Sequence, residues 1–194
     1  MSYDYVTLTL KRVPTPHQAL AAHLRGSPDA IIGQFAPQLG WANNEAAVLV
    51  RQADPAPATS LVAPDLIASA KVERLTPTLR PADDAAPKPG GIYVHRWFEV
   101  DASAADEFVE LSGQGWQRFE AQFDTNIFGL FRATPSAADA EAGIARLLLL
   151  TRYADHGVWE ASRDPTSEAM QIFARRAQLT RRSWAASTLL VAAR

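Results

Sequence analysis

The stretch Gly90–Phe98, GGIYVHRWF, has the alternation of a β-strand and opens the second half of the chain. Its side chains divide between two faces, with Ile92, Val94, Arg96 and Phe98 on one and Tyr93, His95, Trp97 and Glu99 on the other. The stretch begins at the end of Pro81–Gly91 (PADDAAPKPGG), the densest cluster of glycine and proline, which is typical of a boundary between folded segments. We therefore divide the chain into two repeats, 1–84 and 85–194.

The two halves carry the same signals in the same order, which indicates an internal duplication. Each has an alternating strand, a helical stretch, a glycine-centred strand, a strand that ends in arginine, a second helical region and a last strand. Ile32–Phe35 (IGQF) returns as Phe128–Phe131 (FGLF), and Val48–Arg51 (VLVR) returns as Leu149–Arg152 (LLTR), about 100 residues later in each case. A period of that length is typical of duplicated domains rather than of a solenoid.

Helices are expected at Thr15–Arg25 and Ser103–Gln122, where apolar side chains recur at spacings of three and four. A further helix is expected at Thr166–Arg182, which places Met170, Phe173 and Ala177 on one stripe. Its counterpart in the first repeat, Pro64–Ala70, is short, so the second helix of that repeat is expected to be truncated.

This order of elements predicts the fold class. A βαββαβ unit forms a four-stranded sheet with its helices on one face and leaves the other face to be buried. Because a second copy can bury that face, we expect an α+β fold of two tandem ferredoxin-like βαββαβ units, packed sheet to sheet as an α/β barrel. Whether side chains fill the central space or a ligand occupies it stays open.

Composition narrows the function classes. The chain has 194 residues, 47% hydrophobic residues, a net charge of −2 and no cysteine. The lack of cysteine excludes disulfides, thiolate metal sites and a cysteine nucleophile. The slightly negative net charge disfavours nucleic-acid binding through bulk charge. The N-terminus lacks the pattern of a targeting peptide, and the longest run of leucines is Leu147–Leu150, so we expect a cytoplasmic protein without stable membrane insertion. The excess of arginine over lysine and the abundant alanine favour a bacterial source.

Four stretches together resemble the NIPSNAP family of dimeric α/β-barrel, ferredoxin-like proteins. They are, in chain order, Ile31–Phe35 with Leu39–Glu45, then Leu75–Pro81, Gly90–Phe98 and Leu150–Asp155. The resemblance implies a ferredoxin-like barrel and a biochemical activity that is not well defined. The duplication lets one chain close its own barrel, and the side of the first sheet left uncovered by the truncated helix Pro64–Ala70 is where we expect the interface of a homodimer. The wider superfamily includes cofactor-free monooxygenases, haem-binding enzymes and pure binding proteins, so the resemblance implies a range of functions.

The chain also departs from the family pattern. Where the family has the phrase IYELRTY, this sequence reads IYVHRWF, so Tyr93 and Arg96 are kept while Val94 replaces the acidic residue. The second repeat has the loop Pro135–Gly143 in place of the glycine turn, and the first repeat lacks the aromatic phrase WRY. In this phrase the resemblance therefore depends on Tyr93 and Arg96.

Arg96 is the leading candidate for a binding residue, because a charged group in the middle of an apolar strand must be paired or face a polar cavity. It could anchor an anion in the central space, or it could form a structural salt bridge with Glu107 or Asp155. The further ligand-binding candidates are Trp116, Phe119, Arg152 and Tyr153. His95 and Tyr93 are the catalytic candidates; packing of His95 against a helix is the structural alternative.

No histidine pair has the spacing of metal ligands, so no metal site is expected. No cofactor is expected either, although a haem ligated by one of the four histidines stays open. Two functions remain in view. The first is a NIPSNAP-like protein that binds a small ligand or a protein partner, and the second is a cofactor-free monooxygenase-like enzyme acting on a planar aromatic or polyketide-like substrate.

Overall fold

The computed structural model describes residues 1–26, 30–52, 63–83, 85–167, 170–171 and 173–193. Its strands are β1 (Ser2–Leu10), β2 (Ala30–Leu39), β3 (Glu45–Gln52), β4 (Ile67–Pro77), β5 (Ile92–Asp101), β6 (Thr125–Ala133), β7 (Ile144–Tyr153) and β8 (Thr180–Ala193). Its α-helices are α1 (Pro16–Arg25), α2 (Ala105–Gln122), α3 (Ala137–Glu141), α4 (His156–Ala161) and α6 (Ala174–Gln178), and the 3-10 helix Ala102–Ala104 precedes α2. Among the described residues, no helix combines the length and the apolarity needed to cross a membrane.

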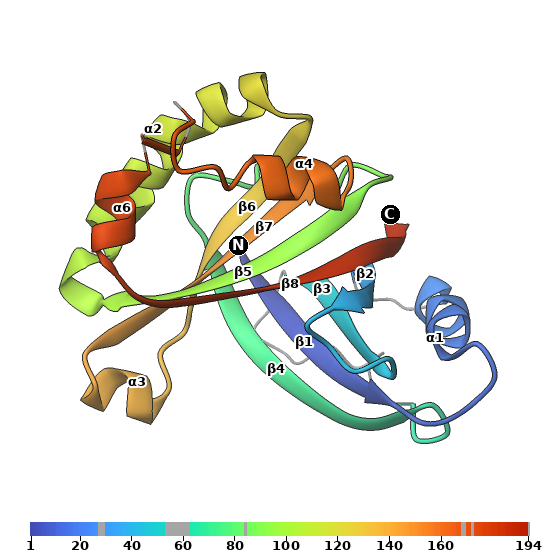
Figure 1. Ribbon diagram of the computed structural model, residues 1–194. Coiled ribbons are helices and arrows are strands. Elements are labelled where there is room, and N and C mark those ends of the chain that lie inside the picture. The colour runs from blue at the N-terminus through green and yellow to red at the C-terminus, as the bar shows by residue number, and fades with distance from the viewer. Residues whose placement is uncertain (27–29, 53–62, 84, 168–169, 172, 194) are drawn as a thin grey trace.

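The eight strands close into an antiparallel barrel in the order β1-β3-β2-β8-β5-β7-β6-β4, which confirms the α+β class (Figure 1). The first four strands lie in the order β4-β1-β3-β2 and the last four in the order β8-β5-β7-β6, so the two orders correspond. The halves meet at two seams, where β2 pairs with β8 and β4 pairs with β6. Closure in this way gives each of these eight strands a neighbour on both sides.

A glycine bulge occurs at the corresponding place in each half. The register of β2 against β3 shifts between Ile31 and Gly33, and that of β6 against β7 shifts between Ile127 and Gly129. At both positions a Cβ atom would crowd the aromatic ring two residues later, at 3.0 Å from Phe35 and 2.9 Å from Phe131. Glycine is therefore needed at both sites to seat a ring inside the barrel.

Side chains of both halves fill the middle of the barrel. Tyr3 packs edge-on against Phe131 at 5.2 Å between ring centroids, and Phe35 packs against Tyr93 at the same centroid distance. All four rings are fully buried. Side chains, and not a ligand, therefore fill the middle section of the central space, which is a packed core.

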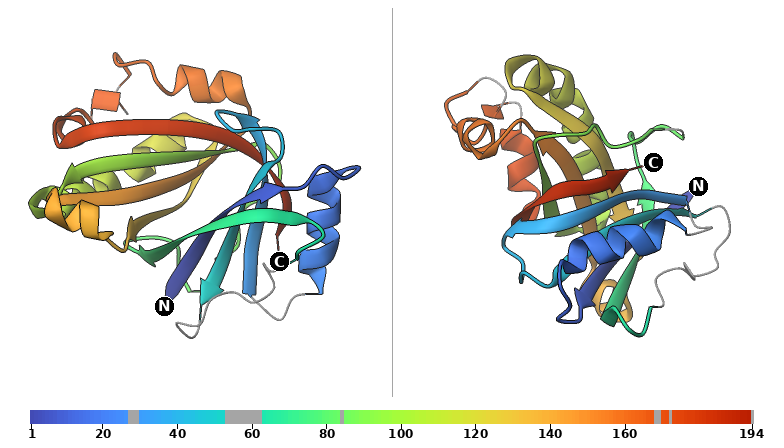
Figure 2. Two further views of the ribbon diagram at one scale, coloured as in Figure 1. Left: turned by 90° about the horizontal axis from the view of Figure 1, so that it is seen from below. Right: turned by 90° about the vertical axis from the view of Figure 1, so that its right-hand side faces the viewer.

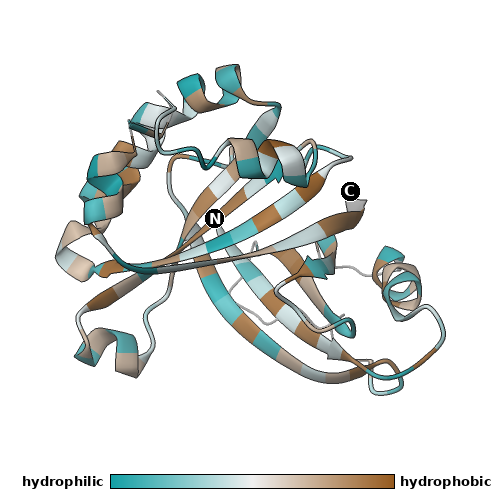
Figure 3. Cartoon of the chain, in the orientation of Figure 1, coloured by the Kyte–Doolittle hydropathy of each residue, from teal (hydrophilic) through white to brown (hydrophobic). Residues whose placement is uncertain are grey.

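Helices cover the outside of the sheet, where each half has a further cluster of buried apolar side chains. Apolar residues, drawn in brown, recur along the strands (Figure 3). Helix α1 packs on the first half through the buried side chains of Leu20 and Leu24. Helices α2, α4 and α6 lie together on the opposite side of the barrel, over the second half (Figures 1 and 2). The longest of them, α2, contributes Phe108, Trp116 and Phe119 to the apolar layer beneath it.

The two expected second helices differ from the structure. In the first half a turn occupies residues 63–66 and Ile67 already begins β4, so Pro64–Ala70 is not a truncated helix. In the second half the expected helix Thr166–Arg182 is not continuous, since α6 spans only Ala174–Gln178 and Thr180 begins β8. Residues 168–169 and 172 of that stretch lie outside the described residues. Pairing with β1 and with β5 overrides the local helical preference in the two regions.

Candidate functional site

A cavity of about 50 Å³ lies between the outer face of the second-half sheet and the helices that cover it. We call it the sheet–helix cavity. Its apolar and aromatic lining is Trp116, Phe119, Ile127, Leu149, Tyr153, Met170 and Phe173, and its polar lining is Arg96, Thr151, Ser162, Arg163 and Arg176. A volume of this size holds a few water molecules, so a larger ligand requires part of the lining to move.

Arg96 reaches the cavity from the middle of β5. It lies between Leu149 of β7 and Ala185 of β8, on the face that carries Val94 and Phe98. Within the described part of the chain, its guanidinium has no hydrogen bond or ion pair. Burial lowers the pKa of Arg96, and the charge of Arg163 adds to that effect while Tyr153 opposes it. The side chain is thus a partly buried cation without a counter-ion among the described residues.

Arg176 brings a second cation to the same cavity from α6. Its guanidinium carbon lies 4.1 Å from the ring centre of Phe173 and 5.3 Å from that of Phe98. Its one hydrogen bond among the described residues goes from Nη1 to the Ser112 hydroxyl at 3.3 Å. Burial, and then the charge of Arg96, lowers the pKa of Arg176 to about 9. Both arginines therefore stay protonated at neutral pH, although their charges repel each other.

Two polar atoms of the cavity lining are buried without a hydrogen-bond partner among the described residues. They are the hydroxyl of Thr151 and the indole N–H of Trp116, whose residues are 2% and 3% exposed. A buried donor or acceptor left without a partner is unfavourable by about 1–3 kcal/mol. A ligand or ordered water in the cavity would satisfy both atoms.

Tyr153 completes the wall at the end of β7. Burial raises the pKa of its hydroxyl, while the charge of Arg96 and a hydrogen bond with Ser162 act in the opposite direction. The phenol is consequently neutral at physiological pH, and it places a further ring beside the edge-on ring of Phe119 at 6.3 Å.

Four of the five predicted ligand-binding residues meet in this cavity, namely Arg96, Trp116, Phe119 and Tyr153. The expectation that Arg96 lies in the central space of the barrel is wrong, because its side chain faces the helices. Its expected salt-bridge partners are also corrected. Glu107 pairs with Arg175 on the surface, and the Asp155 carboxylate accepts a hydrogen bond from the Val158 backbone at the start of α4.

Arg152, the fifth candidate, belongs to the scaffold. Its Nη1 atom pairs with Asp124 at 2.5 Å, and its Nε donates to the Gly90 carbonyl at 3.2 Å. Neighbouring Gly91 has φ +72°, and a Cβ atom there would overlap the Tyr153 carbonyl. Arg152 therefore fixes the end of β7 to the turn that begins β5, and it does not line the cavity.

The two catalytic candidates lie on the other side of the sheet, in the barrel interior. His95 is 1% exposed, and its ring nitrogens contact the Tyr5 hydroxyl at 2.8 Å and the Thr188 hydroxyl at 2.9 Å. The Tyr93 hydroxyl donates to the Lys88 carbonyl at 2.7 Å. Successive side chains of a strand point to opposite faces, so neither residue can act with Arg96 on one ligand. Packing of His95 against a helix is wrong for the same reason.

Four polar lining residues are not among the predicted binding residues, namely Arg176, Thr151, Arg163 and Ser162. Arg176 follows Arg175 within the expected helix Thr166–Arg182. The spacing of three between Phe173 and Arg176 is the one signal that could have placed Arg176 on the buried side. Thr151 follows Leu149 at the strand spacing of two, so it shares that residue's face.

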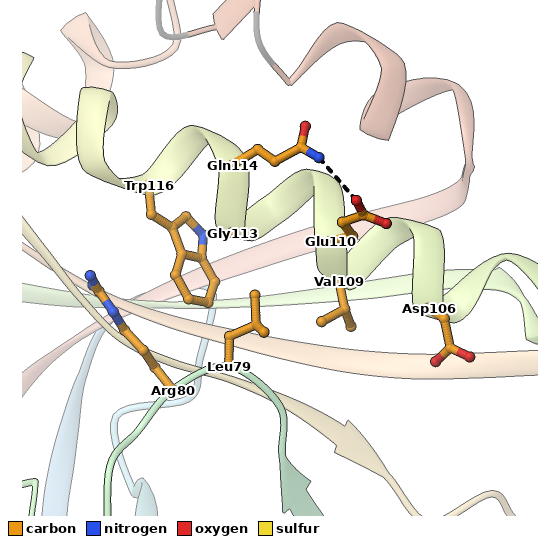
Figure 4. Close-up of a pocket in the computed structure, with 8 residues that line it drawn as sticks. All are labelled: Leu79, Arg80, Asp106, Val109, Glu110, Gly113, Gln114 and Trp116. Atoms are coloured by element: carbon orange, nitrogen blue, oxygen red, sulfur yellow. Dashed lines mark hydrogen bonds between the residues drawn. The ribbon is translucent and has the colours of Figure 1, made fainter.

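An open groove of about 570 Å³ lies on the outer side of α2, beside the segment Leu79–Arg80 (Figure 4). Trp116 lines both this groove and the sheet–helix cavity. The guanidinium of Arg80 lies 5.2 Å from the Trp116 ring centre and pairs with Glu120 at 2.8 Å. Trp116 is therefore the partition between an exposed surface and the buried cavity.

A haem does not fit the sheet–helix cavity, because no histidine of the described residues lines it and its volume is far too small. Of the four histidines, His17 contacts the Asn43 carbonyl at 3.0 Å and His156 contacts the Ser187 hydroxyl at 3.0 Å, both away from the cavity lining. In the described ranges, no group of three metal-ligating side chains comes together.

Comparison with known proteins shows the fold. No family model matches the chain, and no curated protein matches it. A candidate monooxygenase from Fusobacterium nucleatum has a TM-score of 0.65 at 10% identity, over 98% of this chain and 92% of that one. A candidate monooxygenase from Lactobacillus acidophilus scores 0.61 at 10% identity, over 97% and 93%. An anthrone oxidase-like protein scores 0.62 at 14% identity, over 100% and 92%. At these identities the likeness extends to the ferredoxin-like α+β architecture, and NIPSNAP membership is not shown.

Proposed function

We propose that the protein binds a planar aromatic anion in the sheet–helix cavity and oxidises it with O2, without a metal or flavin. The observation that carries the proposal is that two cations, Arg96 and Arg176, line the same aromatic cavity. No carboxylate of the described residues lines it. Two partly buried like charges destabilise each other and require a counter-ion. An anionic ligand supplies one, and its ring would pack against Phe119, Phe173 and Trp116.

The reaction class follows from the chemistry of such an anion. A phenol, enol or anthrone-like compound that loses a proton becomes electron-rich and can transfer an electron to O2. Where a methylene group is flanked by aromatic rings, its two C–H bonds break and a carbonyl forms. One oxygen atom of O2 enters that carbonyl and the other leaves as water, so the four electrons lost by the carbon are those gained by O2. The likeness to two candidate monooxygenases and to an anthrone oxidase-like protein supports this class.

Each group of the site has a distinct part in this proposal. Arg96 and Arg176 lower the pKa of the bound enol or phenol by stabilising its anion. Thr151 and Trp116 donate hydrogen bonds that orient the ring, since both atoms are unpartnered in the cavity. The surrounding rings exclude water, which strengthens these interactions. No side chain is assigned as the base, and hydroxide or the substrate's own acidity supplies that step.

Entry of a substrate requires Trp116 to move, because its indole separates the outer groove from the cavity. The segment of α2 around it contains Gly113 and Gly115, which weaken the helix locally. Rotation of the indole would join the two spaces into a site large enough for fused rings.

The test is oxygen uptake with anthrone as the substrate, in buffer containing EDTA and no added flavin. The expected result is uptake above the uncatalysed rate with anthraquinone as the product. The Arg96→Met variant should lose at least tenfold in rate, and Arg175→Met should retain the wild-type rate because Arg175 pairs with Glu107 outside the cavity. A rate equal to the uncatalysed one for the wild-type protein would contradict the oxidation.

A second candidate function is ligand binding without catalysis, as the NIPSNAP resemblance implies. The lack of an acid or base at the cavity walls other than arginine and tyrosine, among the described residues, favours it. Binding of an aromatic anion without oxygen uptake would support this reading. Both candidates share the same cavity and the same two cations.

We further propose that 1–84 and 85–194 are copies of one ferredoxin-like unit. The corresponding strand orders and the two glycine bulges support this interpretation. A cytoplasmic location and a homodimer remain expectations of the sequence. Light scattering tests the dimer, and a monomeric mass would overturn it.

A further inference from the structure

A second cavity lies at one end of the barrel, inside the strands rather than beneath the helices. It has a volume of about 280 Å³ and is lined by side chains of both halves, including Tyr5, Trp41, His95, Trp97 and Trp184. Its floor is the buried His95, which is 1% exposed, and its rim includes Trp184, which is 39% exposed. We call it the barrel-end cavity. It is separated from the sheet–helix cavity by the β5 strand, whose alternate faces carry His95 and Arg96.

The walls of the barrel-end cavity are flat rings. Trp97 and Trp184 stack with their centroids 6.3 Å apart and their planes inclined by 14°. Tyr5 meets the Trp97 ring edge-on at 5.8 Å, and Trp41 meets His95 at 6.0 Å. Surfaces of this kind favour a planar aromatic molecule over a branched aliphatic one.

One buried polar side-chain atom in this lining has no hydrogen-bond partner in the part of the chain that the structure describes. The indole N–H of Trp41 is buried without an acceptor among the described residues. His95 cannot serve it, because Tyr5 and Thr188 already occupy the two ring nitrogens. A buried donor without an acceptor is unfavourable, so a ligand oxygen at this position would be stabilised.

The charged groups that line the cavity already have partners: Glu45 accepts a hydrogen bond from the Ala42 backbone N–H at 2.8 Å, and the others form ion pairs. Glu73 is held by Lys71 at 2.8 Å and by Arg146 at 2.6 Å, and Arg146 also contacts Asp139 at 3.1 Å. The Arg146 guanidinium lies 5.5 Å from the Trp97 ring centre, where a cationic ligand would otherwise bind. Unlike the sheet–helix cavity, this one therefore favours a neutral molecule.

We propose that the barrel-end cavity is a second ligand site, which takes a neutral planar aromatic molecule with a carbonyl oxygen. The ring lies against Trp97 and Trp184, and the carbonyl accepts a hydrogen bond from the Trp41 indole N–H. This site does not depend on the function proposed for the sheet–helix cavity, because it uses different residues and a different class of ligand.

The test uses coumarin, a neutral bicyclic carbonyl compound, as the probe. The indole N–H signals of the five tryptophans are recorded by ¹H–¹⁵N NMR during a titration, with each signal assigned from a Trp→Phe variant. Coumarin should shift the Trp41 signal saturably and leave the Trp116 signal in place. By calorimetry, Trp41→Phe should weaken binding about tenfold, which corresponds to the loss of one hydrogen bond.

Two controls keep the result interpretable. Trp184→Ala removes a partly exposed stacking surface and should weaken coumarin binding without unfolding the protein. Arg96→Met should leave coumarin binding unchanged, so a failure of this site is distinguishable from a failure of the sheet–helix cavity. An unmoved Trp41 signal at saturating coumarin would overturn the proposal, and so would equal affinity of the wild type and Trp41→Phe, because water alone would then satisfy the indole.

Discussion

Tyr5 and His95, from opposite halves of the chain, are joined by a hydrogen bond of 2.8 Å inside the barrel. The Thr188 hydroxyl donates to the Tyr93 carbonyl at 3.3 Å, so it accepts from His95 Nε2 at 2.9 Å. His95 Nδ1 therefore accepts from Tyr5, and the ring is neutral. Burial lowers the pKa of His95 to about 3, which keeps it neutral across the physiological range.

Stability should accordingly decrease as the pH falls below 6.5, the ordinary pKa of a histidine. The unfolded chain takes up a proton at His95 from that pH downward, whereas the folded chain does so only near pH 3. The contribution of His95 is complete above this window and is lost within it by about 1 kcal/mol per pH unit. Urea unfolding of the wild type and His95→Gln at pH 7, 6 and 5 measures it. A stability difference between the two proteins that does not change with pH would contradict the assignment.

Two glycines of α2 should respond in opposite ways to alanine. A Cβ atom at Gly115 would overlap the buried Phe173 ring, whereas one at Gly113 would meet only the tip of Leu79, which is 57% exposed. Gly115→Ala should destabilise the fold by about 2 kcal/mol and block the cavity, because Phe173 cannot yield easily. Gly113→Ala should be neutral or stabilise by up to about 1 kcal/mol through helix propensity. Thermal unfolding of the two variants tests the contrast, which equal effects would refute.

Arg96→Met should stabilise the ligand-free protein by about 1 kcal/mol, because it removes one of two partly buried cations that repel each other. The same variant should lose affinity for aromatic anions. Arg175→Met is the matched control, since it removes a surface ion pair next to Arg176 and should change stability by less than about 1 kcal/mol. If Arg96→Met destabilises the ligand-free protein strongly, an acceptor from the chain itself pairs with Arg96.

Arg152→Met should lower stability and keep anion affinity, whereas Arg96→Met should raise stability and lower anion affinity. Loss of the contacts with Asp124 and the Gly90 carbonyl should destabilise the fold by about 2 kcal/mol. Anion affinity, measured by calorimetry well below the unfolding temperature, should stay within twofold of the wild type because Arg152 does not line the cavity. A large loss of anion affinity would contradict this prediction and would indicate that Arg152 takes part in binding.

Much of the fold could be predicted from the chain because its strands obey a simple rule. The alternation of GGIYVHRWF correctly separates Val94 and Arg96 from Tyr93 and His95, but the expectation that the Arg96 face lies inside the barrel is wrong, since that face is covered by helices. The two IGQF-like phrases fall at corresponding bulges in β2 and β6. The expected second helices failed because strand pairing across the barrel, which leaves no local pattern, decides the structure of residues 67–77 and 180–193.

The candidate site was predictable only in part. Trp116, Phe119, Tyr153 and Arg96 line one cavity, but the same alternation that defines β5 separates Arg96 from His95 by the thickness of the sheet. Arg176 and Arg175 are adjacent and chemically identical in sequence. Only the packing of Phe173 under α2 turns Arg176 inward and leaves Arg175 with Glu107 at the surface.

The most direct test of the central claim is an NMR titration with benzoate and benzamide, two molecules of the same shape that differ in charge. Trp116 is the reporter, because its unpartnered indole N–H lines the sheet–helix cavity. Benzoate should shift this signal saturably in the wild type, benzamide should bind there at least tenfold more weakly, and Arg96→Met should abolish the preference for the anion. Equal affinity for the two molecules, or a benzoate response that survives in Arg96→Met, would contradict an anion site formed by Arg96 and Arg176.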